Sequence, residues 1–229
     1  MALIRHGHYR QLAQAPSALQ PFPLTQRGRD QAALAVEPII DFCHYLQIRP
    51  LSVIDSSRML RGWQTATIIA RGLAQQLDQR LWVEETEALA ERSVGAVANL
   101  TLDQIATVVA EDPRLAPLPP NWKADSHFTL PFQGAESLLK AGERVALHLE
   151  KRVAEMLQSG SEKPQLKLIV GHGAAFRHAA FYLGLLPFEN IARLSMYHAS
   201  PIFLRCDRMG RWELVAGDWK IREWSEFVD

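Results

Sequence analysis

The sequence predicts an α/β fold: a mostly parallel central sheet with helices on both faces, and a lid insertion at about 87–133. Short apolar runs alternate with longer segments of helical periodicity from residue 2 to residue 216, a pattern typical of parallel sheets. The 229 residues are 48% apolar and 22% charged, which suits one large domain with a sizeable core. A proline-rich segment interrupts the alternation once, so we expect a single domain over 1–229 that carries one insertion.

Apolar spacing and capping residues give the expected elements. In chain order they are a strand at 2–5, a loop at 9–24, a helix at 26–47, a strand at 51–55, a helix at 59–78, a short strand at 81–83, a helix at 135–158, a strand at 166–170, helices at 173–185 and 188–194, and strands at 201–205 and 212–216. Thr25 is the expected N-cap of the helix at 26–47. Pro38 predicts a kink or break inside that helix.

The segment at about 87–133 has one helical piece at about 101–110 and little periodicity elsewhere. A long proline-rich excursion within a compact domain is typical of a lid or binding loop. A linker between two domains is the alternative. The insertion also contains large apolar side chains, which suggest a substrate with a hydrophobic body: Leu115, Leu118, Trp122, Phe128 and Phe132.

Composition excludes several classes of function. Basic and acidic residues balance at 25 each, whereas a duplex-binding surface would show a basic excess. The longest apolar runs fall short of the ~18 residues that a membrane span requires, and no charged leader precedes an apolar stretch. Cys43 and Cys206 are too few for a disulfide framework or a zinc site. We therefore expect a cytoplasmic protein with reduced thiols and no nucleic-acid or membrane partner.

Charged and imidazole side chains follow several of the expected strands. Arg5-His6, Ser56-Ser57 and His172 each come at or just after a strand end, and Arg61 lies one turn into the next helix. Ligands of open α/β sheets bind beyond the carboxyl ends of the strands, and a helix N-terminus there favours an anion. The sequence therefore predicts a phosphate pocket in which the two histidines meet and His6 attacks phosphorus.

These residues belong to motifs that resemble the histidine phosphatase superfamily, with its phosphoglycerate-mutase-like fold. The similar segments, in family order, are Leu3-Ile4-Arg5-His6-Gly7, Leu24-Thr25-Gln26-Arg27-Gly28, the run from Ser56 to Ala66 that contains Arg61, Leu89-Ala90-Glu91-Arg92-Ser93-Val94-Gly95, Gly134-Ala135-Glu136-Ser137 and Val170-Gly171-His172-Gly173. The resemblance covers roughly residues 2 to 205. It implies phosphoryl transfer through a phosphohistidine.

The resemblance implies a role for each matching residue. His6 is the expected nucleophile, and Arg5 and Arg61 would grip phosphate bidentately. His172 would donate to the phosphoryl oxygens in the transition state. Glu91 is the expected proton donor to the leaving alkoxide and then the base for water. We also expect phosphate- or substrate-binding roles, through side chain or backbone, for Gly7, His8, Arg92 and Gly173.

A phosphatase acting on a small phosphate ester or a phosphoprotein, without metal or cofactor, is the favoured function. A cofactor-dependent phosphoglycerate-type mutase is the alternative, although His8-Tyr9-Arg10 and Val94 depart from the mutase pattern. A metal-dependent hydrolase using His6 and His8, or an inactive phosphate-binding scaffold, are further alternatives. The sequence leaves the substrate and a homo-oligomeric state open.

Overall fold

The computed structural model describes residues 1–160 and 164–222. Its strands are β1 Ala2–Arg5, β2 Arg49–Pro50, β3 Val53–Ser57, β4 Trp82–Thr86, β5 Gln165–Leu166, β6 Leu168–Gly171, β7 Leu194–Ser195, β8 Pro201–Cys206, β9 Trp212–Ala216 and β10 Lys220–Ile221. Its α-helices are α1 Gln26–Leu34, α2 Val36–Leu46, α3 Leu60–Leu77, α4 Leu102–Glu111, α5 Leu138–Gln158, α6 Gly173–Tyr182 and α7 Phe188–Ile191. Short 3₁₀ helices lie at Glu87–Leu89 and Gly95–Val97.

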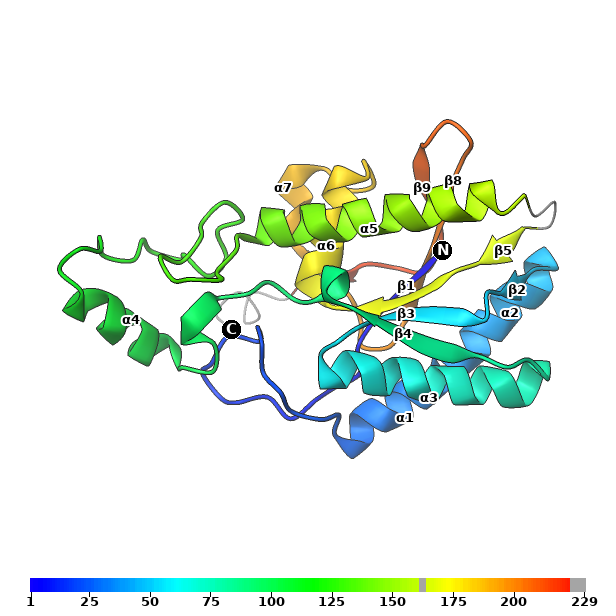
Figure 1. Ribbon diagram of the computed structural model, residues 1–229, viewed down its shortest axis with the longest axis horizontal. Coiled ribbons are helices and arrows are strands. Elements are labelled where there is room, and N and C mark those ends of the chain that lie inside the picture. The colour runs from blue at the N-terminus through cyan, green and yellow to red at the C-terminus, as the bar shows by residue number, and fades with distance from the viewer. Residues whose placement is uncertain (161–163, 223–229) are drawn as a thin grey trace.

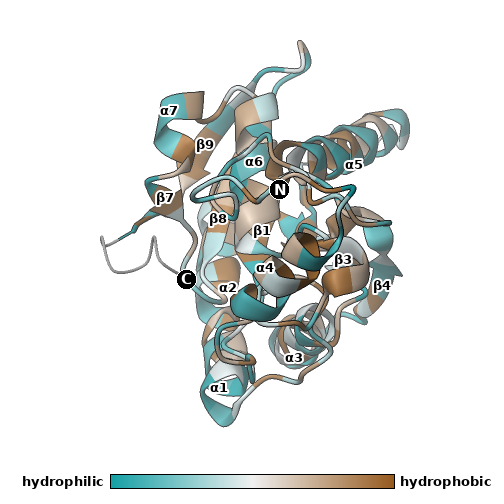
Figure 2. Ribbon diagram, turned by 90° about the vertical axis from the view of Figure 1, so that its left-hand side faces the viewer, coloured by the Kyte–Doolittle hydropathy of each residue, from teal (hydrophilic) through white to brown (hydrophobic). Residues whose placement is uncertain are grey.

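Six of the strands form the central sheet in the order β4-β3-β6-β1-β8-β9. β1, β3, β4 and β6 pair in parallel, while β8 and β9 add two antiparallel pairings at one edge. Helices α5 and α6 cover one face, and α1, α2 and α3 cover the other (Figures 1 and 2). The predicted α/β fold with a mostly parallel sheet is therefore confirmed.

Side chains of β1 alternate between two hydrophobic clusters, because successive residues of a strand point to opposite faces. Ala2 and Ile4 pack with α2 and α3, whereas Leu3 packs with α5 and α6. The parallel register sets Arg5 opposite Gly171. The two residues that follow, His6 and His172, therefore leave the sheet side by side at its carboxyl edge.

The expected helix at 26–47 is two helices, and the break comes earlier than Pro38. Ala35 separates α1 from α2, and Pro38 lies in the first turn of α2, where its missing N–H leaves no hydrogen bond unmade. Thr25 caps α1 as predicted, accepting from Gly28 N. The expected helix at 135–158 begins later, because Ser137 forms its N-cap and accepts from Lys140 N.

The segment 87–133 has a hydrophobic cluster of its own. Buried Val94, Val97, Ile105 and Leu130 form its centre. The aromatic side chains that suggested an apolar substrate pack against this cluster, among them Trp122, Phe128 and Phe132. Their apolar surface therefore stabilises the insertion itself; Trp122 also lines the cavity described below, and a hydrophobic substrate stays a prediction. Figure 1 shows this segment, including α4, projecting beyond the end of α5.

Candidate active site

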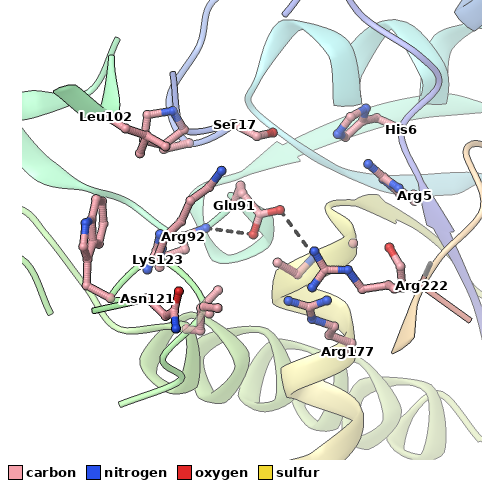
Figure 3. A pocket seen from close by; sticks show the side chains of 18 residues that line it. Arg5, His6, Ser17, Glu91, Arg92, Leu102, Asn121, Lys123, Arg177 and Arg222 are labelled. Carbon is pink, nitrogen blue, oxygen red and sulfur yellow. Dashed lines mark hydrogen bonds between the residues drawn. The ribbon is translucent and has the colours of Figure 1, made fainter. Parts of the chain in front are cut away.

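A cavity of about 430 Å³ opens at the carboxyl edge of the sheet. It lies between the ends of β1 and β6, the N-terminus of α6 and the segment 87–133 (Figure 3). The polar side chains that line it are those of Arg5, His6, Ser17, Glu91, Arg92, Asn121, Lys123, Arg177, Ser195 and Arg222. Four of the predicted site side chains, Arg5, His6, Glu91 and Arg92, therefore meet in one cavity.

His6 is buried and held in one tautomer. Its Nδ1–H donates to Gly7 O at 2.8 Å, because a carbonyl oxygen can only accept. Its Nε2 accepts from Arg61 Nε at 3.2 Å. Burial lowers the pKa of His6 well below its usual value, and the nearby cation of Arg61, with His172, Arg5 and His198, lowers it further. The ring is therefore neutral, with the lone pair on Nε2.

Arg61 lies behind His6 and does not line the cavity. Its Nη1 donates to Gln20 O, and its Nη2 donates to Ser17 O and Ala18 O at 2.8 and 3.0 Å. The guanidinium also sits 4.4 Å from the centre of the Tyr9 ring. Here Arg61 fixes the loop at 17–20 and orients His6, and its bidentate grip on phosphate stays a prediction.

His172 also packs behind His6, with ring centres 4.9 Å apart. Its Nε2 lies 2.9 Å from Ser57 Oγ, and its Nδ1 has no hydrogen-bond partner within residues 1–160 and 164–222. Burial lowers the pKa of His172 well below its usual value, and the cations Arg61, Arg5 and Arg144 add to the shift. The predicted meeting of the two histidines is therefore seen, with His172 neutral.

Glu91 lies at the N-terminus of α6. Its carboxylate accepts from Ala174 N and Ala175 N at 3.4 and 3.1 Å, and from Arg92 N at 2.9 Å. Unsatisfied N–H groups and the helix dipole favour a negative charge at this place. The contacts hold Glu91 rigidly on the cavity wall, within the same small space as His6 (Figure 3).

Two predicted residues, Gly7 and His8, do not line the cavity. A Cβ on Gly7 would lie 2.3 Å from Gly28 O, so this glycine permits close packing of the chain on α1 rather than on a ligand. His8 turns away, with its Nδ1 2.9 Å from Thr25 Oγ1. Gly173 does line the cavity, where a Cβ would press on the Arg5 side chain.

Several residues of the site were not predicted, among them Arg177, His198 and Arg222. Arg177 lies four residues after Gly173 on α6, so helical spacing placed it on the same face. His198 donates from Nδ1 to His6 O at 2.8 Å, and Arg222 reaches the cavity from beyond β10. The sequence carried no comparable signal for His198 or Arg222, because both follow two-residue strands without periodicity.

Other kinds of site are absent from the described residues. Within 1–160 and 164–222, no three His, Cys, Asp or Glu side chains gather as metal ligands. No helix in that same part of the chain combines the length and apolarity that a membrane crossing needs. Cys43 and Cys206 are free thiols.

Comparison with known proteins identifies the family. The sequence model of the histidine phosphatase superfamily (branch 1) matches residues 1–219, whereas no curated protein matches the chain. A mycobacterial glucosyl-3-phosphoglycerate phosphatase in complex with VO3 is 26% identical, with a TM-score of 0.67 over 95% of this chain and 98% of its own. "Mycobacterial hydrolase 2" is 24% identical, with a TM-score of 0.68 over 99% and 93%. A putative alpha-ribazole-5'-P phosphatase from Escherichia coli is 19% identical, with a TM-score of 0.63 over 93% of each chain.

Proposed function

The chain belongs to the histidine phosphatase superfamily, and from this premise we propose that it hydrolyses a phosphate monoester through a phosphohistidine on His6. The observation that carries the proposal is the state of His6. Its ring is neutral and borders a cavity rich in arginine, and its Nε2 keeps a lone pair that accepts from Arg61. An imidazole in this state is a nucleophile, and guanidinium groups stabilise the charge on a transferring phosphoryl group.

Attack requires that the Nε2 lone pair be released from Arg61. A phosphoryl oxygen that takes over the Arg61 Nε–H as acceptor would free that lone pair for phosphorus. The new N–P bond forms as the bond to the ester oxygen breaks, and Glu91 gives its proton to the leaving oxygen. Water then attacks phosphorus while Glu91 takes up a proton, which restores His6 and releases inorganic phosphate.

His172, which lies behind His6, would assist the transfer. His172 Nδ1 is buried beside the reacting ring and has no partner within the described residues. In the tautomer that carries its proton on Nδ1, it would donate to a phosphoryl oxygen in the transition state. Ser57 Oγ then donates to Nε2 and fixes that tautomer.

Substitution of the nucleophile tests the proposal. We expect His6→Ala to lower hydrolysis of p-nitrophenyl phosphate on the order of 10⁴-fold. The wild-type protein, quenched during turnover, would carry an acid-labile phosphate on His6 that mass spectrometry locates. His44→Ala, on an exposed face of α2, is the matched control and should retain full activity. Unchanged hydrolysis in His6→Ala would overturn the mechanism.

The substrate stays open, because the phosphatases among the similar structures act, by their names, on different esters at 19–26% identity. A mutase would return the phosphoryl group to another hydroxyl, so the assay should measure inorganic phosphate as well as ester isomers. Release of stoichiometric phosphate supports hydrolysis. Cytoplasmic location and independence of metal and cofactor stay predictions, and activity that survives a chelator would support the second.

A further inference from the structure

A histidine outside the cavity joins the insertion to helix α6. His178 lies in the second turn of α6 and is fully buried. Its Nδ1 lies 2.7 Å from Ala174 O, and its Nε2 lies 3.0 Å from Ser126 Oγ. Because a carbonyl oxygen can only accept, Nδ1 carries the proton and donates. In the neutral ring Nε2 then accepts, and the Ser126 hydroxyl donates to it.

The surroundings of His178 keep its ring neutral. Burial and the nearby cation of Arg177 lower its pKa to about 4, Arg92 adds to this, and the hydrogen bond to Ala174 O offsets it only in part. An imidazolium has no free lone pair and could not accept from Ser126. The hydrogen bond therefore runs from Ser126 to His178 in the folded protein near neutral pH.

The packing of α5 on α6 leaves room for this ring. A Cβ on Gly142 of α5 would lie 2.4 Å from His178 Cβ, so the two helices approach this closely because residue 142 has no side chain. Ser126 is held at the same place by its backbone, since Ser126 O accepts from Leu139 N in the first turn of α5 at 3.0 Å. Both α5 and α6 therefore fix the position of Ser126.

Ser126 follows directly on a stretch of the insertion that lines the cavity. The residues at 121–124 all belong to the cavity wall. They form a turn in which Ala124 N and Asp125 N donate to Asn121 O at 2.9 and 3.3 Å. A closed turn of this kind moves as a unit, so the contacts of Ser126 also set the position of the wall at 121–124.

Helix α6 holds two parts of the site at once. Ala174 N donates to Glu91, the proposed proton donor, while Ala174 O accepts from His178. One turn of helix thus separates the carboxylate from the ring that holds the cavity wall. Figure 3 shows Asn121 of this wall on the side of the cavity away from His6. The wall therefore faces the space beyond a phosphoryl group on His6, where the leaving group of an ester would lie.

We propose that the hydrogen bond from Ser126 to His178 positions the cavity wall at 121–124 against the leaving group of the ester, which makes both of them positioning residues. The proposal rests on the phosphatase function. Without this hydrogen bond the wall would spend more time away from the ester, and binding of its alcohol part would weaken. Contacts made equally in the ground state and in the transition state change KM rather than kcat.

The kinetics of Ser126→Ala on p-nitrophenyl phosphate test the proposal. We expect KM to rise about three- to tenfold, the effect of losing one hydrogen bond, while kcat stays within about twofold of wild type. Inorganic phosphate has no leaving group, so its inhibition constant should also stay within about twofold of wild type. A variant that merely misfolded would instead lower kcat through its smaller active fraction and leave KM unchanged.

Further variants separate the hydrogen bond from other effects of substitution. Ser126→Thr keeps the hydroxyl and should retain the wild-type KM, whereas His178→Asn keeps a donor for Ala174 O, is too short to reach Ser126, and should raise KM as Ser126→Ala does. The double variant should raise KM no further, because both substitutions remove the same hydrogen bond. Ser159→Ala removes a serine hydrogen bond to Met156 O at the far end of α5 and should change nothing.

Hydrogen exchange follows the wall without catalysis. In Ser126→Ala, peptides that span 119–128 should exchange about three- to tenfold faster than in the wild-type protein, whereas peptides of α3 should keep their rate. An unchanged KM in Ser126→Ala, or a KM raised equally in Ser126→Thr, would overturn the proposal while the phosphatase function stands. If the wild-type protein does not hydrolyse p-nitrophenyl phosphate, the phosphatase function fails and the role in ester binding fails with it.

Discussion

Two groups of buried charges lie on this sheet, and they are built in opposite ways. Asp55 on β3 receives His148 Nε2 at 2.8 Å, Arg152 Nε at 2.6 Å and Lys167 Nζ at 2.5 Å. Burial alone would raise the pKa of Asp55, but hydrogen bonds from these partners lower it to about 2. At His6 and His172, burial and the neighbouring cations act in the same direction and lower both pKa values.

The difference teaches which charges serve stability and which serve chemistry. Around Asp55 the opposite charges are all supplied by the protein, so the group is complete without a ligand. At the cavity five cationic side chains and the carboxylate of Glu91 line an open space, and their positive potential attracts an anion from outside. A cluster of cationic side chains around a cavity is therefore the clearer mark of function in this fold.

Removing the anion at the centre of the first group should have the largest effect on folding. Asp55→Asn leaves the buried Lys167 without its carboxylate, while Arg152 keeps Glu84 and Glu155, so we expect a loss of about 3–5 kcal/mol in the free energy of unfolding. Urea denaturation measures it. Hydrolysis by the folded fraction should stay within about threefold of wild type, because no Asp55 contact involves the cavity.

Asp41→Asn makes the same chemical change on an exposed face of α2 and should leave the denaturation midpoint unchanged. If Asp55→Asn instead spared stability and removed activity, the division between the two groups would be wrong.

A substitution in the group around His6 should lower catalytic activity rather than stability. Arg61→Lys keeps a positive charge but cannot reproduce the planar set of donors that binds three carbonyl oxygens and His6. We expect kcat/KM to fall about 10²-fold, the scale of losing one preorganised donor at a reacting centre. Steady-state kinetics on p-nitrophenyl phosphate measures this, and the loss should appear in kcat as well as KM, since Arg61 acts by positioning the nucleophile.

Arg71→Lys, exposed on the same helix α3, is the matched control and should behave as wild type. Full activity in Arg61→Lys would show that His6 needs no orientation by the guanidinium.

Much of this arrangement follows from the sequence, and the reason is topological. Parallel strands carry their carboxyl ends to one edge, so His6 and His172, which follow β1 and β6, had to meet there. The same argument could not anticipate the contacts of Arg61. They depend on how the backbone folds at 17–20, a loop without periodicity.

The core of the insertion and the shortest strands could not be predicted from a sequence pattern. Apolar content alone does not separate residues that pack on one another from residues that pack on a ligand, so the hydrophobic core of the insertion, on which Phe128 packs, was not predicted. Strands of two residues have no alternation to read, so β7 and β10 were missed. The carbonyl of Leu194 on β7, which anchors Arg177, was therefore not predicted either.

The smallest expected effect is a difference between the two groups in the pH range over which they lower the free energy of unfolding. Burial and the cation of Arg5, with His8 and Arg27, lower the pKa of His198 to about 3, so the folded protein keeps His198 neutral while the unfolded chain takes up a proton below about pH 6.5. Stability that depends on this difference is present above pH 6.5 and is lost as the pH falls, at about 1.4 kcal/mol per pH unit for each such histidine. Asp55, with a folded pKa of about 2, contributes a loss only below about pH 4.

His198→Gln should therefore flatten the fall in unfolding free energy between pH 6 and pH 4 by about 1.4 kcal/mol per pH unit, measured by urea denaturation across that range. Gln retains an N–H that can donate to His6 O, so the geometry of the nucleophile should change little. His44→Gln, exposed on α2, makes the same substitution outside the site and should keep the wild-type slope. A wild-type slope in His198→Gln would show that the cavity admits the imidazolium in the folded state, and the contrast with the complete charge group at Asp55 would then fail.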